Sequence, residues 1–278
     1  LEKTEGIVDI ESNNNQSPAD FIFKFNYEKL SEAGFTPRDA GLALRIALFG
    51  SVATEVNTRY EDIDVVVILT ASGIHAQNTI DLAPYGKAIV VEKPMALTLQ
   101  DADTMIEACD EYGVKLFVVK QNRFNLPVVQ LRKALDQGRF GKLIMGTIRV
   151  RWCRTQEYYD QDPWRGTWAY DGGVLSNQAS HHIDLLEWMM GDVETVFAKS
   201  TQALADIEAE DTAVVILKFR NGALGIIEAT TATRPKDLEG SISILGEKGS
   251  VEIGGFAVNE MKTWNFSKSI SEDEEIIK

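Results

Sequence analysis

Hydrophobic and polar positions form their clearest pattern in the first half of the chain. Three apolar runs of strand length are each followed by polar residues: 64–69, 87–91 and 114–119. Runs that are apolar along most of their length are typical of strands buried on both faces of a parallel sheet. Residues 75–83 predict a helix, and a second helix is predicted between Thr98, with Asp101 as its capping-box partner, and Gly113. Alternating strands and helices predict a right-handed parallel sheet whose successive strand ends deliver polar residues to one edge.

The pattern changes after a helix predicted at 126–136. Residues 143–152 alternate strictly, which is typical of an antiparallel strand with one solvated face. Residues 153–168 are expected to form a long aromatic-rich loop, and residues 177–190 to form a helix. Further strands are predicted at 195–200, 212–219, 223–230, 241–245 and 250–253, with hairpin turns at 221–222 and 246–249. A parallel α/β unit is therefore expected to end near residue 121, followed by a mostly antiparallel sheet.

The two ends of the chain are harder to interpret. Residues 12–17 predict a loop, the alternating phenylalanines of 21–25 a short strand, and residues 42–49 a buried strand. No G-x-G-x-x-G follows that strand, and the space before residue 62 is too short for a dinucleotide unit of roughly 30 residues. The acidic tail, 267–278, has no obvious packing partner.

Composition excludes several classes of protein. The net charge of −14 argues against binding to nucleic acid or to an anionic membrane surface. No apolar run approaches the roughly 20 residues that span a bilayer, and no signal-peptide pattern opens the chain. The cysteines, Cys109 and Cys153, lie in unrelated segments, which favours reduced thiols and a cytoplasmic protein.

One candidate for chemistry lies on the helix predicted at 177–190. Asn177, His181 and Asp184 are spaced i, i+4 and i+7, so they are expected to share one helical face. An amide, an imidazole and a carboxylate together can orient a substrate hydroxyl, accept its proton and hold the tautomer of the imidazole. The alternative is a polar helix start with an ordinary histidine. A metal site at His181, His182 and Asp184 is not expected, because the spacing matches no common metal motif.

Lys93 and Arg165 supply two further candidates. Lys93 follows a predicted strand end and is either a solvated turn residue or a partly buried amine of lowered pKa that forms an acid/base couple with His181. Arg165 lies between Trp164 and Trp168 in the sequence. This segment is expected either to bind an anion together with a sugar or base ring, or to be a loop that only packs against the protein. The nearby residues Arg149, Arg151 and Arg154 favour the anion site.

These motifs, in this order, resemble the glucose–fructose oxidoreductase / inositol dehydrogenase / MocA family. The resemblance covers about residues 58–266 and is carried by 64–75, the Val91-Glu92-Lys93-Pro94 stretch, Gly172-Gly173 and His181-x-x-Asp184. It implies a Rossmann-like dinucleotide-binding domain over 1–121, with 1–57 unassigned, and an α+β domain over 122–278 with a large open, mostly antiparallel sheet for substrate binding and oligomerisation. It also implies NAD as cofactor, with NADP not excluded, and oxidation or reduction of a sugar carbon.

The resemblance also assigns roles to residues. Lys93 matches the family's catalytic acid/base, while His181 and Asp184 match the histidine and last aspartate of its D-x-G-x-H-x-x-D pattern. Asn177 replaces the first aspartate, so it is expected to orient the substrate, with His181 as proton carrier beside Lys93 and Asp184 as the orienting group. The expected cofactor-binding residues are Thr70, Ser72, His75, Glu92, Lys93, Gln121, Trp164 and Arg165. The expected substrate-binding residues are Arg123, Asn125, Tyr159, Arg165, Gln178 and His182.

Within the family, residues 121–125, 158–168 and 176–178 resemble the branch that oxidises C3 of UDP-N-acetylglucosaminuronate for polysaccharide biosynthesis. The family's first strand, glycine-rich turn and ribose-binding acid have no counterpart in residues 1–57, and its members usually continue past this chain's last residue. The sequence therefore leaves open a fragment, a rearranged sequence or a form without cofactor. An NAD-dependent glycoside hydrolase and a cofactor-less binding or oligomerisation protein remain alternatives. A homodimer or homotetramer is expected, with Thr147 and Ile227 on the associating sheet face.

Overall fold

The computed structural model describes residues 7–12, 21–25, 51–57 and 62–276. Its contacts divide the chain into two compact units, Leu1–Ile68 and Leu69–Lys278. Two antiparallel strand pairs make up the described part of the first unit: β1 (Ile7–Ser12) with β2 (Phe21–Phe25), and β3 (Ser51–Asn57) with β4 (Asp62–Ile68). The strands predicted at 21–25 and 64–69 are confirmed, whereas the strand predicted at 42–49 lies outside the described residues.

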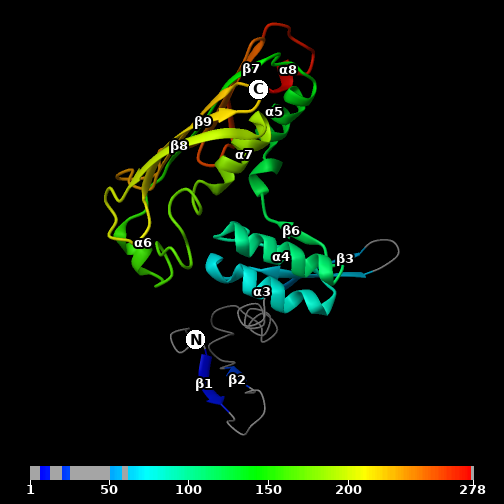
Figure 1. Ribbon diagram of the computed structural model, residues 1–278, viewed down its shortest axis with the longest axis vertical. Helices are drawn as coiled ribbons and strands as arrows, with labels where there is room; N and C mark the ends of the chain where they lie inside the picture. Colours follow the sequence, from blue (N-terminus) through cyan, green and yellow to red (C-terminus); the bar gives the residue numbers. More distant parts are fainter. Residues whose placement is uncertain (1–6, 13–20, 26–50, 58–61, 277–278) are drawn as a thin grey trace. The chain divides into compact units, whose positions relative to one another are not determined.

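The second unit opens with helices and a parallel strand pair (Figure 1). Strands β5 and β6 run parallel, with Ile89 opposite Leu116, and α4 connects them. The Thr98 hydroxyl accepts a hydrogen bond from the backbone N–H of Asp101 at 3.0 Å, so the predicted cap of α4 is confirmed. The elements are η1 (Ser72–Ile74), α3 (His75–Leu82), η2 (Ala83–Tyr85), β5 (Ala88–Val91), α4 (Leu99–Glu111) and β6 (Leu116–Val118).

A seven-stranded sheet dominates the rest of this unit, in the order β13-β12-β11-β7-β10-β9-β8. Strand β7 was expected to be antiparallel, but it pairs in parallel with β10 and antiparallel with β11. Strands β8, β9 and β10 alternate in direction, so β7, β8 and β10 all run the same way in the sheet. The strands are β7 (Leu143–Arg151), β8 (Val193–Thr201), β9 (Thr212–Phe219), β10 (Leu224–Thr230), β11 (Glu239–Gly246), β12 (Gly249–Gly254) and β13 (Glu260–Phe266).

Two helices cover one face of this sheet, α5 (Leu126–Asp136) and α7 (Ser180–Met190). Helix α7 packs on β7 and β11, and its side chains Leu185, Leu186 and Met190 are fully buried together with Ile148 of β7. These side chains belong to the main hydrophobic core of the described chain. Burial of apolar side chains is the dominant favourable term in folding, so this core holds the unit together. The core fixes α7, and therefore His181, against the sheet.

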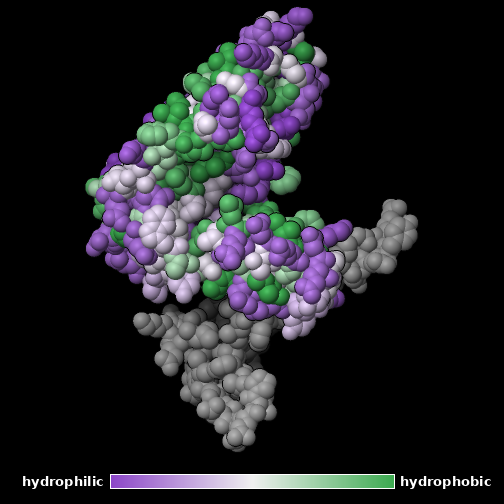
Figure 2. Space-filling view, in the orientation of Figure 1, coloured by the Kyte–Doolittle hydropathy of each residue, from purple (hydrophilic) through white to green (hydrophobic). Residues whose placement is uncertain are grey.

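The opposite face of the sheet is open and partly apolar. Ile216 on β9 lies between Phe197 on β8 and Ile226 on β10 in the strand register, and all three are exposed. Figure 2 shows hydrophobic residues over the region of β8 and β9. Ile227 was expected on the associating face, but it is 4% exposed and faces the core, because neighbouring residues of a strand point to opposite faces. The apolar residue that β10 presents next to Thr147 is Ile226.

Three further elements differ from the sequence expectations. The aromatic-rich loop contains a short helix, α6 (Gln156–Asp160), and strand β13 was not predicted. The acidic tail packs rather than extending freely, since α8 (Asp273–Ile276) places the Asp273 carboxylate 2.7 Å from both guanidinium nitrogens of Arg139. Among the described residues, no helix is long and apolar enough to cross a membrane.

Candidate active site

Lys93 is the centre of a small polar cluster. It lies two residues after the end of β5, in the Glu92-Lys93-Pro94 turn, and its backbone N–H donates to the Glu92 carboxylate at 3.0 Å. Its Nζ donates to Oδ1 of Asn177 at 2.7 Å and to the backbone carbonyl of Asn177 at 3.2 Å. Burial lowers the pKa of Lys93, and the carboxylates of Glu92 and Asp171 oppose that shift. The amine is therefore buried enough to lose its proton more easily than an exposed lysine.

Asn177 lies before helix α7 and not on it. The helix begins at Ser180, so Asn177 does not share a helical face with His181 and Asp184 as expected. The local reason is that the Asn177 carbonyl is taken by Lys93 Nζ and by the Ser180 hydroxyl, the latter at 2.9 Å, while the first helical bonds start at Ala179. Asn177 and His181 nevertheless belong to one cluster, because Lys93 lies near both.

Asp171 extends the cluster and was not among the residues expected from the sequence. Its Oδ1 accepts a hydrogen bond from the Asn177 side-chain amide, and its Oδ2 accepts from the Gly166 backbone N–H at 2.7 Å. The side chain is 2% exposed, and burial raises the pKa of its carboxyl group. The only sequence signal for Asp171 was its place directly before Gly172-Gly173. In the structure, Gly172 has φ of +75°, and a side chain at Gly173 would collide with the Glu210 carboxylate.

His181 lies on the first turn of α7 and is 7% exposed. Its Nε2 is 3.2 Å from the side-chain nitrogen of Gln121, and its Nδ1 is buried without a partner among the described residues. Burial, followed by the charges of Lys93 and Lys120, lowers the pKa of His181 to about 4. The imidazole is therefore neutral near pH 7, with one ring nitrogen that makes no hydrogen bond among the described residues.

Asp184 does not orient His181 as expected. Its carboxylate receives two hydrogen bonds from Arg123, at 2.7 and 2.8 Å, and Lys120 Nζ lies 3.6 Å away. A bidentate pair with a guanidinium is a strong contact for a carboxylate, and no hydrogen bond joins Asp184 to His181 among the described residues. Gln121 is the side chain that contacts His181, while the expected substrate residue Arg123 is held by Asp184 and lies 4.8 Å from the Trp188 ring.

The loop after Leu69 is tied to the Lys93 turn through His75. This histidine is fully buried, with Nδ1 2.8 Å from the Pro94 carbonyl and Nε2 3.0 Å from the Thr70 carbonyl. Both ring nitrogens therefore face backbone oxygens, so the role that the geometry supports for His75 is holding this loop. Thr70 is exposed and donates to Asn78, and Ser72 is buried.

Gly73 joins the same loop to the aromatic-rich segment. Its N–H donates to the Tyr170 carbonyl at 3.1 Å, and a Cβ at this position would lie 1.9 Å from the Ala169 carbonyl oxygen. Only glycine allows the two backbones to approach so closely. The Thr70–His75 loop and the loop that carries Asp171 are therefore fixed to each other.

Arg165 is stacked within its own loop. Its guanidinium lies 4.4 Å from the ring of Tyr158 and 4.9 Å from that of Trp164, and its Nε donates to Asp162 at 2.9 Å. Its charge also acts on the Asp171 carboxyl group. Arg165 and Trp164 are thus close to the cluster at Lys93, on the side of the aromatic-rich loop.

The other arginines expected to favour an anion site are engaged elsewhere. Arg151 makes a bidentate pair with Glu228 at 2.6 and 2.8 Å, and Arg149 pairs with Glu252 at 3.1 Å. These positions on β7 alternate with core residues, so they face the open side of the sheet. Arg154 pairs with Asp237 at 3.2 Å.

Several expected substrate residues are buried or engaged within the protein. The Tyr159 hydroxyl lies 2.9 Å from that of Thr231, and Asn125 donates to the Ala257 carbonyl at 2.7 Å. Gln178 is 6% exposed. His182 is fully buried beside Trp152, without a hydrogen-bond partner for either ring nitrogen among the described residues, and burial lowers its pKa to about 4.

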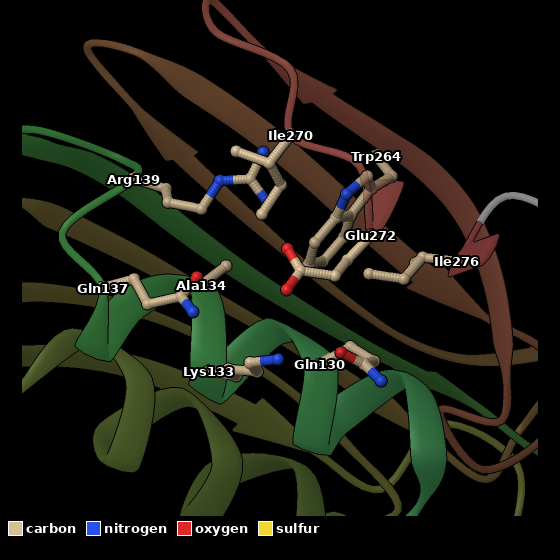
Figure 3. A pocket seen from close by; sticks show the side chains of 9 residues that line it. All are labelled: Gln130, Lys133, Ala134, Gln137, Arg139, Trp264, Ile270, Glu272 and Ile276. Carbon is tan, nitrogen blue, oxygen red and sulfur yellow. The ribbon is translucent and has the colours of Figure 1, made fainter. Parts of the chain in front are cut away.

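A cavity between α5, β13 and α8 lies outside this cluster (Figure 3). It is lined by residues that include Gln130, Arg139, Trp264 and Glu272, and its volume is about 10 Å³. That is room for about one water molecule, too little for a ligand. Arg139 and Trp264 already hold the Asp273 carboxylate there, so this cavity belongs to the packing of the C-terminal segment.

The cluster has the chemical groups of a site for oxidising or reducing an alcohol. Lys93 and Gln121 follow the ends of two adjacent parallel strands, which is where open α/β sheets bind ligands. The Nδ1 of His181 is buried and has no hydrogen-bond partner among the described residues. Among the described residues no group of His, Cys, Asp and Glu side chains is arranged to hold a metal ion.

Two family models match the chain. Residues 3–120 match an oxidoreductase family model with an NAD-binding Rossmann fold, and residues 128–252 match the GFO/IDH/MocA C-terminal domain. The first match begins at residue 3, so it covers a segment in which the sequence alone offered no counterpart of the family. The expected fold class, an α/β Rossmann-like part followed by an α+β part with an open sheet, is confirmed.

Solved structures of two dehydrogenases are also similar. The WlbA dehydrogenase from Bordetella pertussis, in complex with NADH and UDP-GlcNAcA, is 44% identical with a TM-score of 0.76, over 90% of this chain and 68% of that one. The WlbA dehydrogenase from Chromobacterium violaceum, in the same kind of complex, is 41% identical with a TM-score of 0.77, over 90% of this chain and 76% of that one.

A curated relative is the myo-inositol 2-dehydrogenase of Thermotoga maritima. It is 31% identical over 211 residues, which are 73% of this chain and 58% of the relative. The chain therefore spans a little more than half the length of this curated relative.

Proposed function

Because the chain belongs to the Gfo/Idh/MocA oxidoreductase family, we propose that it acts as an NAD-dependent sugar dehydrogenase on the C3 hydroxyl of UDP-N-acetylglucosaminuronate. The observation that carries the proposal is Lys93, a half-buried amine held by Asn177 near the neutral imidazole of His181. The two WlbA dehydrogenases, which were crystallised with NADH and UDP-GlcNAcA, support the choice of cofactor and sugar.

Lys93 is the group that we assign to proton transfer. Its neutral amine would take the proton of the C3 hydroxyl while the hydrogen on C3 leaves as hydride, so the alcohol becomes a ketone. A good proton carrier has a pKa near the working pH. Burial moves the pKa of Lys93 down toward that range, whereas the pKa of His181 is about 4, which makes the imidazole a weak base. The sequence expectation had Lys93 and His181 share the proton transfer, whereas we assign it to Lys93 alone.

His181 is then the group that positions the hydroxyl. A neutral imidazole can donate and accept hydrogen bonds, and Gln121 contacts Nε2 while Nδ1 remains for the ligand. Asn177 keeps the expected role of orienting group, directed at Lys93. We assign Asp184 a supporting role, because its carboxylate pairs with Arg123 and Lys120, which follow the end of β6.

NAD, when bound, supplies a hydride acceptor at this site. The residues that we propose to line it are those at the strand ends and on the neighbouring loops: Thr70, Ser72, His75, Glu92, Lys93, Gln121, Trp164 and Arg165. His75 contributes by fixing its loop, as its ring nitrogens are engaged with backbone carbonyls. NADP is not excluded by the described residues.

For the sugar nucleotide, we propose Arg123, Asn125, Tyr159, Arg165, Gln178 and His182 as the substrate side. Arg165 is the most direct candidate, since a guanidinium stacked between Tyr158 and Trp164 suits a carboxylate or phosphate. Tyr159, Gln178 and His182 are buried, so they would shape the walls of the site.

We also propose that the chain associates through the open face of its sheet and that it is located in the cytoplasm. The exposed apolar residues of β8, β9 and β10 support a homodimer or homotetramer, because large exposed apolar patches usually mark interaction sites. Cys109 and Cys153 are both free thiols, which agrees with a reducing compartment.

Turnover of the uronate sugar tests the proposed function. Purified protein should form NADH from NAD and UDP-N-acetylglucosaminuronate, and Lys93→Ala and His181→Ala should each lower kcat by about 100-fold or more. Lys115→Ala, at the opposite end of β6 and exposed, is the matched lysine control and should keep normal activity.

Three results would contradict the proposal. Unchanged turnover in both variants would remove Lys93 and His181 from the mechanism. Release of a sugar's leaving group without net NADH would favour the NAD-dependent glycoside hydrolase. Absence of NAD(H) and NADP(H) binding in calorimetric titration would favour the cofactor-less binding protein.

A further inference from the structure

An amide bridges a half-buried cation and a buried carboxylate in this cluster. Lys93 Nζ faces Oδ1 of Asn177 at 2.7 Å, and the amide nitrogen of the same side chain donates to Asp171. An ammonium only donates hydrogen bonds, and a carboxylate only accepts them. The amide of Asn177 is therefore fixed in a single orientation by its two neighbours.

The Asp171 side chain makes few other polar contacts among the described residues. Among the described residues it has no salt bridge, and its hydrogen-bond partners there are the Gly166 N–H and the Asn177 amide. The nearest basic side chain of its own loop, Arg165, is paired with Asp162. A carboxylate that is 2% exposed is costly to keep without a cation, so a compensating charge is expected nearby. The Lys93 ammonium, one amide away, is that charge.

We propose that Asp171 is a positioning residue for Lys93, acting through the Asn177 amide to hold the amine in place and to balance its charge. The inference rests on the proposed function for its catalytic consequence, but the Lys93–Asn177–Asp171 relay is a property of this chain's own residues. A direct carboxylate contact would hold the lysine as an ammonium ion. The intervening amide keeps the carboxylate at a distance, so the amine can be either charged or neutral.

The groups around Lys93 set the expected direction of its titration. Glu92 and Asp171 favour the charged amine, Lys120 and burial favour the neutral one, and the neighbouring His181 is neutral. Removing the charge of Asp171 should therefore lower the pKa of Lys93. The acid limb of a pH–rate profile that depends on neutral Lys93 should move to lower pH.

Asp171→Asn is the first test. If the oxygen of the substituted side chain keeps the Gly166 N–H, its new amide nitrogen meets the amide nitrogen of Asn177. The Asn177 side chain must then turn over, and Lys93 Nζ loses its acceptor. We expect kcat to fall by about 10- to 100-fold with little change in KM. Asp160→Asn, an exposed carboxylate on the same loop that contacts only Gln156 among the described residues, is the matched control.

The exchange variant Asp171→Asn with Asn177→Asp is the second test. The amide at position 171 can accept from Gly166 and donate to the carboxylate at position 177, which then contacts Lys93 directly. The hydrogen-bond chain and the net charge are both kept. The pKa of Lys93 should then rise above that of the unmodified protein, so the pKa should increase in the order Asp171→Asn, unmodified protein, exchange variant. This variant keeps the proposal testable if the single variant does not fold.

The readout is the pH dependence of acylation of the Lys93 amine, followed by mass spectrometry without substrate. The expected order supports the relay. An unchanged Lys93 titration in both variants, matching Asp160→Asn, would overturn it and leave Asp171 as a loop contact to Gly166. If Lys93 titrates in the expected order but the unmodified protein does not oxidise the uronate sugar, the relay stands and the proposed function fails.

Discussion

At the scale of single residues, the histidines of α7 couple stability to pH. Burial is the largest cause of the low pKa of His181 and of His182, about 4 in each case against an ordinary value of 6.5. Between these values the unfolded chain binds protons that the folded chain does not. Stability should therefore be complete above about pH 7 and should fall as the pH drops from 6.5 toward 4.

This coupling predicts that His182→Leu reduces acid sensitivity. Leucine removes one titrating group and two buried nitrogens without partners among the described residues. Between about pH 7 and about pH 5, urea unfolding of the unmodified protein should show a loss on the order of 2 kcal/mol for each histidine. The variant should lose correspondingly less. An equal loss in both proteins would show that His182 is not responsible, and a scan from about pH 7 to about pH 8 serves as control because the histidines stay largely neutral there.

At the scale of elements, a side-chain cap marks the start of α4. Thr98 caps α4 with its hydroxyl oxygen, which accepts from the Asp101 N–H, while its hydroxyl hydrogen is donated to the Asp101 carboxylate at 2.7 Å. This pair lies in the segment between β5 and β6, so it helps to hold the Lys93 turn next to the helix that follows it.

Thr98→Ala should therefore destabilise the second unit by about 1 kcal/mol, as for other N-cap threonines. Thr104→Ala on the same helix is the matched control. Its hydroxyl only donates back to the Gln100 carbonyl within the helix, and alanine is the better helix former, so its stability should be unchanged or slightly higher. Chemical denaturation measures both, and equal effects would argue against the cap.

At the scale of the whole molecule, the open sheet face determines the expected association. Phe197, Ile216 and Ile226 lie side by side across three strands, with exposed fractions of 63%, 52% and 36%. A symmetric dimer presents the same patch twice, so a charge placed at its centre would face its own copy.

Ile216→Glu should therefore convert the proposed oligomer into monomers in light scattering. Leu99→Glu, at an 86% exposed position on α4, adds the same charge away from this face and should leave the oligomer intact. A monomeric unmodified protein, or an oligomer that persists in Ile216→Glu, would contradict association through β8, β9 and β10.

The sequence by itself determined many of the described elements and supplied most of the candidate site residues. Apolar runs and strict alternation are set by periods of local geometry, so they located β5, α5, β9 and the Thr98 cap directly. Lys93 and His181 were recognisable because the motifs that contain them are local in the chain. The sequence could not show whether Ile226 or Ile227 faces the core, because both are apolar and only strand pairing decides which one is buried.

Only the tertiary structure decided how those residues are connected. Lys93 comes from a segment distant from the one that carries Asp171 and Asn177, and no spacing in the sequence indicates that the Asn177 amide links the other two side chains. Tertiary packing also decided three other features that the sequence did not indicate: the start of α7 at Ser180, the pairing of Asp184 with Arg123, and the packing of Asp273 on Arg139. Buried polar groups take the best partner that the fold brings within reach, and that partner is set by packing rather than by neighbours in the chain.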